Sequence, residues 1–129
     1  EQYTIALATA KPEHYAKDIL DHFELTPYFD VIVGANYESG LLHKKEILEK
    51  ALELCGNPLT DENGNRMVFM VGDRKYDVEA ANELGCISIG VTYGYGTEAE
   101  LKEADAEYLC DDVDEIADVL DLEALMVRR

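Results

Sequence analysis

The feature that most limits the fold of this chain is an alternation of short apolar runs with longer stretches of helical periodicity. Such alternation is typical of a parallel sheet that is covered by helices. We therefore expect an α/β fold, a Rossmann-like parallel sheet with helices on both faces. The expected strands are Tyr3–Ala8, Asp30–Ala35, Met67–Gly72, Ile87–Tyr93 and Glu107–Cys110.

Helices are expected between these strands. The first follows Pro12, where Ala16, Ile19, Leu20 and Phe23 form an apolar stripe. The second runs from about His43 to Cys55, and the third follows Asp73 and ends at Gly85, because glycine readily adopts the left-handed conformation of a helix cap. Residues 56–66 (GNPLTDENGNR) have no periodicity and predict a loop.

Length and charge exclude several classes of protein. The 129 residues, of which 47% are hydrophobic, predict one domain over residues 1–129. The net charge of −17 disfavours nucleic acid polymers and anionic membranes as partners. Neither a membrane-spanning run nor a signal peptide pattern is present in the sequence, so we expect a cytoplasmic protein. The cysteines Cys55, Cys86 and Cys110 stand in apolar surroundings and are expected to be buried thiols.

Two acids four residues apart, Asp73 and Asp77, stand where an expected strand passes into a helix. Ligands of open α/β sheets bind at the carboxyl ends of the strands, where Asp73 lies. Each acid alone has a structural explanation, with Asp73 as a helix cap and Asp77 as an acid favoured by the helix dipole. As a pair, they are also a candidate site for Mg²⁺, which is typically held by one or two carboxylates.

Two further residues are expected near strand ends. Thr9 follows the first strand, so its hydroxyl and the following amides could bind an anion or could merely satisfy local backbone groups. Lys44 stands three and four residues before Ile47 and Leu48, which places it on the apolar face of its helix, whereas Lys45 falls on the exposed side. Lys44 is therefore expected near the sheet edge, unless its stem only covers apolar surface.

Together, Thr9 in ALATAKPE, Lys44 in KKEIL, and Asp73 with Asp77 in VGDRKYD resemble the haloacid dehalogenase superfamily of Mg²⁺-dependent phosphatases. The tail GVTYGYGTEAELKEADAEYLCDDVDEI is similar to the phosphoglycolate phosphatase and 5′-nucleotidase-like branch. The resemblance implies hydrolysis of small phosphate monoesters through an aspartyl-phosphate. The substrate would be a phosphorylated metabolite or a nucleotide.

The resemblance also implies a role for each residue. Asp73 would hold Mg²⁺, and Asp77 would bind it directly or orient its waters. Lys44 would neutralise the phosphate and the nucleophile, and Thr9 with the Ala10 amide would bind a phosphoryl oxygen.

The family's nucleophile motif, DxDx[TV], is the part that this chain lacks. The nearest imitation, Asp112 and Asp114 in YLCDDVDEI, follows the last strand, and Asp112 with Glu115 fits a helix capping box better. We therefore expect the C-terminal part of a phosphatase core, without its central first strand and its cap. Such a fragment is expected to be inactive alone, and to be stable only with its missing N-terminal half or by self-association.

Two other classes of protein share parts of this pattern. A receiver-type signalling domain needs an acceptor Asp after its third strand and an acid pair near its first, and the early strands here end in LATA and VGAN. A non-catalytic interaction domain with a phosphatase-like shell remains the alternative. The glycine-rich run TYGYG (92–96) predicts either a loop near the metal site or a plain turn between half-buried tyrosines.

Overall fold

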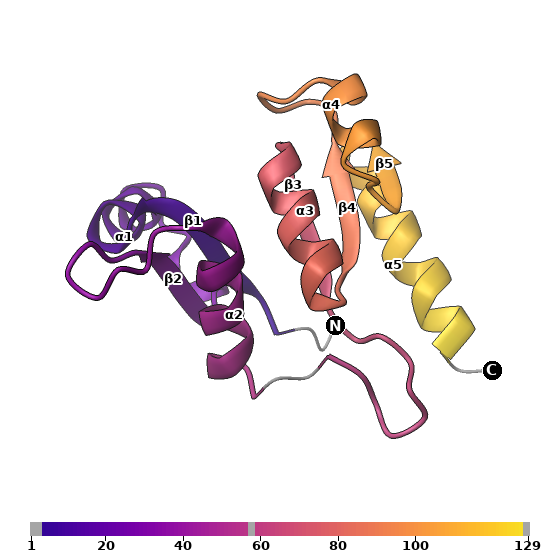
Figure 1. The fold of residues 1–129 in the computed structure, drawn as a ribbon, viewed down its shortest axis with the longest axis horizontal. Coiled ribbons are helices and arrows are strands. Elements are labelled where there is room, and N and C mark those ends of the chain that lie inside the picture. Colours follow the sequence, from indigo (N-terminus) through magenta and orange to yellow (C-terminus); the bar gives the residue numbers. More distant parts are fainter. Residues whose placement is uncertain (1–3, 57–58, 128–129) are drawn as a thin grey trace. The chain divides into compact units, whose positions relative to one another are not determined.

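The computed structural model describes residues 4–56 and 59–127, which fold as two compact units, Glu1–Pro58 and Leu59–Arg129. Both units alternate strands with helices (Figure 1). The first contains β1 (Ala6–Pro12), α1 (Glu13–His22), the short 3-10 helix η1 (Thr26–Tyr28), β2 (Val31–Ala35) and α2 (Lys44–Leu54). The second contains β3 (Phe69–Gly72), α3 (Lys75–Leu84), β4 (Ile87–Val91), α4 (Glu98–Glu103), β5 (Tyr108–Cys110) and α5 (Val113–Val127).

The first unit is a parallel pair of strands, β1 and β2, between two helices. Val33 and Ala35 of β2 are buried against Ile47 and Ala51 of α2. Successive strand residues point to opposite faces, so Gly34 points to the other face, where a Cβ atom would lie 2.4 Å from Cα of Glu13 at the start of α1. The two helices therefore cover opposite faces of this small sheet.

The second unit is a parallel sheet of three strands in the order β3-β4-β5. Ile89 and Val91 of β4 and Cys110 of β5 form a core with Ile116 and Val119 of α5. On the other face, the hydroxyl of Ser88 donates to the Oδ1 atom of Asn82 in α3 over 2.9 Å. Helices therefore cover both faces here as well. The predicted α/β fold with parallel strands is confirmed.

The boundaries differ from the expected ones in a physically simple way. Four strands are shorter than their apolar runs, because residues such as Met67 and Tyr93 lie beyond the paired region. β1 instead continues past Ala8 to Pro12, so that Pro12 caps α1 rather than starting it. The predicted start at Tyr3 lies outside the described residues. As predicted, Gly85 ends α3 in the left-handed conformation, with φ of 84°.

The cysteines carry free thiols. Cys86 and Cys110 are buried as predicted, whereas Cys55 is half-buried. Burial raises the pKa of the Cys86 thiol. Within residues 4–56 and 59–127, the helices are all too short or too polar to cross a bilayer.

Candidate active site

Asp77 is a buried carboxylate in the first turn of α3, with only 7% of its surface exposed. Its Oδ2 atom accepts the backbone N–H of Arg74 over 3.3 Å, so the acid satisfies a donor at the start of the helix, in agreement with the structural one of its two interpretations. The carboxylate also packs against Gly72 at the end of β3, where a Cβ atom would lie 2.4 Å from Oδ2. A glycine at this position therefore lets the acid lie close to the strand end.

Asp73 does not cap α3, contrary to one of the two interpretations of its position. The N-cap residue is Arg74, and the Oδ2 atom of Asp73 accepts the backbone N–H of Tyr95 over 2.8 Å. The carbonyl of Asp73 accepts the N–H of Gly96 over 3.0 Å. β3 and β4 are parallel with Gly72 opposite Gly90, so the loop after β4 starts at the same sheet edge as Asp73.

The glycine-rich segment 92–96 forms a loop that packs closely against Asp73. A Cβ atom on Gly94 would lie 2.3 Å from Cβ of Asp73, and one on Gly96 would lie 2.1 Å from the Asp73 carbonyl oxygen. The segment thus lies beside the predicted metal residue. The tyrosines are not half-buried as predicted, because Tyr93 is 55% exposed and Tyr95 is 94% exposed.

Glu100, which sequence reasoning missed, ties α4 to the start of α3. Its Oε2 atom accepts the backbone N–H of Lys75 over 2.7 Å and the Nε–H of Arg74 over 2.9 Å. These two donors hold the pKa of the Glu100 carboxyl below its ordinary value. The sequence TEAE (97–100) matches a capping box, and the Thr97 hydroxyl accepts the Glu100 N–H as in that motif. The Glu100 side chain, however, binds the neighbouring helix rather than its own.

Lys44, in the first unit, is the first residue of α2 and reaches Ala8 in β1. Its Nζ atom donates to the carbonyl of Ala8 over 3.1 Å, and the side chain is half-buried. A cation at a helix N-terminus is unfavourable for the helix dipole, so helix stability does not explain this lysine. The sequence predicted the strand to end at Ala8, so Lys44 lies beside the residue expected there, although β1 itself continues to Pro12. Lys45 is exposed, as predicted.

Thr9 and Ala10 lie in an irregular part of β1. Ala8 pairs with Val33 and Pro12 with Ala35, so residues 9–11 stand opposite the single residue Gly34. The Thr9 hydroxyl accepts the backbone N–H of Lys11 over 3.2 Å, which is the local interaction considered as one alternative. Ala10 is exposed. Such bulges are common beside active sites, because they redirect side chains and backbone groups.

The residues present suit Mg²⁺ better than a metal that needs a complete protein cage. Among the described residues, three or more His, Cys, Asp or Glu side chains nowhere gather as metal ligands. Mg²⁺ is commonly held by one or two carboxylates, with waters and substrate oxygens as its other ligands. Asp73 and Asp77 provide two such carboxylates at a strand end. A carboxylate has about four acceptor positions, and the Tyr95 N–H occupies one of those on Asp73.

Asp112 caps the start of α5. The Oδ1 atom of Asp112 accepts the Glu115 N–H over 2.9 Å at the start of α5, and the Glu115 carboxylate accepts the N–H of Asp111. The predicted capping interaction of Asp112 with Glu115 is confirmed, although the reach-back goes to Asp111. Asp111 also accepts the hydroxyl of Thr92 over 2.6 Å.

A model of the HAD-hydrolase-like family matches residues 43–116, which is more than half of the chain. The chain belongs to the haloacid dehalogenase-like hydrolase family. The matched region contains Lys44, Asp73, Asp77 and Glu100, whereas Thr9 and Ala10 precede it.

Other members of the haloacid dehalogenase-like family are similar over most of this chain. A 5′-nucleotidase of Pseudomonas aeruginosa is 33% identical over 119 residues, which cover 92% of this chain and 51% of that protein. A phosphoglycolate phosphatase of Vibrio cholerae is 29% identical, covering 92% of this chain and 50% of that protein. These names support the phosphoglycolate phosphatase and 5′-nucleotidase-like branch of the superfamily, whose members are phosphoric monoester hydrolases.

Solved structures of the same superfamily have the same fold. A predicted phosphatase from Clostridium acetobutylicum superposes with a TM-score of 0.81 at 38% identity, covering 92% of this chain and 53% of that one. A putative phosphatase from Clostridium difficile gives a TM-score of 0.80 at 38% identity, covering 91% and 52%. The chain thus spans about half the length of the relatives it matches.

Proposed function

We propose that this chain is the C-terminal part of the core of a Mg²⁺-dependent phosphatase that hydrolyses small phosphate monoesters through an aspartyl-phosphate. The observation that carries the proposal is the acid pair at the end of β3. Asp77 is buried against Gly72, and Asp73 is gripped by the 92–96 loop. Two carboxylates that are fixed at one strand end of an acidic chain favour the binding of a cation there.

Each of the residues that the resemblance singles out has one task in the proposed reaction. Asp73 binds Mg²⁺, and Asp77 binds the ion or orients its waters. Bound Mg²⁺ supplies positive charge against the phosphoryl oxygens. Lys44, whose ammonium lies at the Ala8 carbonyl, neutralises the phosphate and the nucleophile, and Thr9 with the Ala10 amide binds a phosphoryl oxygen.

The nucleophile belongs to polypeptide outside residues 1–129 in this proposal. An aspartate there attacks phosphorus and releases the alcohol, and water then cleaves the acyl phosphate to give inorganic phosphate. Residues 1–129 form one partial core domain that is inactive alone, and it is stable with its N-terminal half or by self-association. The substrates are phosphorylated metabolites or nucleotides, which the names of the relatives support. The reaction takes place in the cytoplasm, which the free thiols support.

The test measures phosphate release by the complete protein and by residues 1–129, with phosphoglycolate and a nucleoside 5′-monophosphate as substrates. We expect the complete protein to be active with Mg²⁺, inactive with EDTA, and slowed by about 10³-fold or more in Asp73→Asn. Asp114→Asn, which removes an exposed acid of α5, is the matched control and should keep its activity.

Two outcomes would overturn this proposal. If EDTA and Asp73→Asn both left the activity of the complete protein unchanged, a catalytic metal site at Asp73 would be excluded. Appreciable Mg²⁺-dependent activity of a homogeneous 129-residue chain would show that the nucleophile lies within it. A calorimetric titration with Mg²⁺ and with inorganic phosphate separates an enzyme from an interaction domain, which has no reason to bind either through Asp73 and Lys44.

A further inference from the structure

The segment from Tyr95 to Glu100 holds residues 73–75 through four hydrogen bonds. Two of them go from the loop to Asp73, from the N–H groups of Tyr95 and Gly96. The other two go from Arg74 and Lys75 to a single oxygen of Glu100. The predicted metal residue is therefore held by the loop, and the residues that follow it are held by α4.

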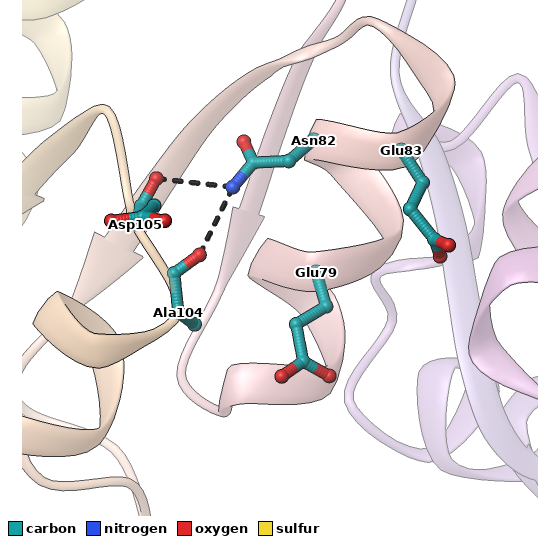
Figure 2. Close-up of a pocket in the computed structure, with 5 residues that line it drawn as sticks. All are labelled: Glu79, Asn82, Glu83, Ala104 and Asp105. Atoms are coloured by element: carbon teal, nitrogen blue, oxygen red, sulfur yellow. Dashed lines mark hydrogen bonds between the residues drawn. The ribbon is translucent and has the colours of Figure 1, made fainter.

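Helix α4 is fixed to α3 at both of its ends. Near its start, Glu100 binds the N-terminal residues of α3. Past its end, the Nδ2 atom of Asn82 in α3 donates to the carbonyls of Ala104 and Asp105, both over 3.0 Å (Figure 2). Between these points, Leu101 is fully buried. A helix of six residues has little stability of its own, so these contacts determine its position.

The pocket in Figure 2 does not itself suggest a ligand site. It is lined by Glu79, Asn82, Glu83, Ala104 and Asp105. The two polar contacts that the figure shows are used to fix the turn after α4, where Asp105 adopts a left-handed φ of 66°. The contacts in this pocket therefore serve to attach α4 to α3.

We propose that Glu100 is a positioning residue for the metal site. It holds the 92–96 loop against Asp73, so that the Asp73 carboxylate is oriented for the cation. The inference rests on the proposed function, because it assumes that Asp73 binds Mg²⁺. Glu100 does not bind the ion. It acts through Arg74 and Lys75, the residues that directly follow Asp73, and through the start of α4, which directly follows the loop. Residues that orient metal ligands commonly change metal affinity by about 10-fold or more when they are removed.

The test is Mg²⁺ affinity, measured by calorimetry on the complete protein without substrate. We expect Glu100→Ala to bind Mg²⁺ about tenfold more weakly than the wild type. Glu100→Gln keeps an acceptor oxygen and should recover most of that loss. The matched control is Glu98→Ala in the same helix, whose exposed side chain pairs with Lys102 over 2.8 Å and should change affinity by less than about twofold.

A second measurement, hydrogen exchange of the Tyr95 and Gly96 amides in metal-free protein, does not depend on the ion. We expect both amides to exchange faster in Glu100→Ala than in the wild type and in Glu98→Ala. Wild-type Mg²⁺ affinity and unchanged exchange in folded Glu100→Ala would overturn the inference. If Glu100→Ala does not fold, Glu100→Met, which keeps the length of the side chain but has no acceptor oxygen, decides in the same way against Glu98→Met.

The two proposals fail in different ways. If the wild type binds no Mg²⁺, the proposed function fails, and the positioning of a metal ligand fails with it. Faster exchange in Glu100→Ala would then show only that Glu100 holds the loop. If the wild type and Glu100→Ala bind Mg²⁺ equally well, the proposed function stands and the positioning role is wrong.

Discussion

Gly72 and Asp77 approach each other so closely that a Cβ atom on Gly72 would lie 2.2 Å from Cβ of Asp77. Real side chains do not tolerate such a distance, and both neighbouring groups belong to fixed elements, the end of β3 and the first turn of α3. The glycine of the sequence GDRKYD is thus required sterically, because the last aspartate of the same sequence packs against it. The glycine allows the buried acid at position 77 to lie over the strand end.

Gly72→Ala is therefore expected to displace Asp77. We expect the free energy of unfolding to fall by about 1–3 kcal/mol, as for other overpacked sites. We also expect Mg²⁺ affinity to fall by about 10-fold, because the acid is moved from its position. Chemical denaturation and Mg²⁺ titration of the complete protein measure the two effects.

Gly90→Ala is the matched control, because Gly90 is the residue of β4 that pairs with Gly72. Its Cβ atom would meet only the ends of the Leu101 and Leu109 side chains, at 3.2 Å, which is a much milder conflict than the one at Gly72. We expect a stability change of about 1 kcal/mol or less and wild-type Mg²⁺ affinity. Equal Mg²⁺ affinities of the two variants would contradict the steric role of Gly72.

Periodicity predicted that Lys44 lies on the apolar face of α2, because the neighbouring residues determine the orientation of the helix. Ile47 and Leu48 are buried, so a residue three or four positions earlier lies over the same face. The alternation of strands and helices likewise followed from local patterns. The longer β1 did not, because its irregular end depends on Gly34 and the start of α1, which local propensity does not describe.

The surroundings of Asp73 were only partly predictable, for a different reason. Its hydrogen-bond partner, Tyr95, is 22 residues away in the sequence, and no local pattern identifies such a contact. A local cap was the natural alternative, and it is wrong. Glu100 was missed for the same reason, because its partners Arg74 and Lys75 are 26 and 25 residues away in the sequence. The pair of glycines before it, Gly94 and Gly96, is the sequence feature that could have indicated a close approach of backbones.

Lys44→Met is expected to lower kcat/KM for phosphate esters by about a hundredfold or more in the complete protein. The variant keeps the length and the apolar stem of the side chain but removes the charge that lies at the Ala8 carbonyl. Lys45→Met is the matched control, since it removes the same charge from the next, exposed position. Similar losses in both variants would indicate a general charge effect and would contradict a specific role for Lys44. Thermal melts verify that both variants fold.

The Glu100 carboxyl is expected to make stability depend on pH in the acid range. The hydrogen bonds from the Lys75 N–H and from Arg74 hold its pKa below the ordinary value of 4.5. The unfolded chain then binds the proton more tightly than the folded one, so acid favours unfolding. The contribution of Glu100 is fully present above the ordinary value and is lost as the pH falls through the lowered pKa.

Denaturation of the wild type and of Glu100→Gln between about pH 6 and pH 3 measures this dependence. The difference in the free energy of unfolding is expected to be largest near neutral pH and to shrink as the wild-type carboxyl becomes protonated. Glu98→Gln removes an exposed carboxylate from the same helix and serves as the control for a general change of charge. NMR titration of the Glu100 carboxyl gives the pKa directly. A pKa at or above 4.5 would mean that Glu100 does not hold Arg74 and Lys75 as described, and would remove the basis of its positioning role.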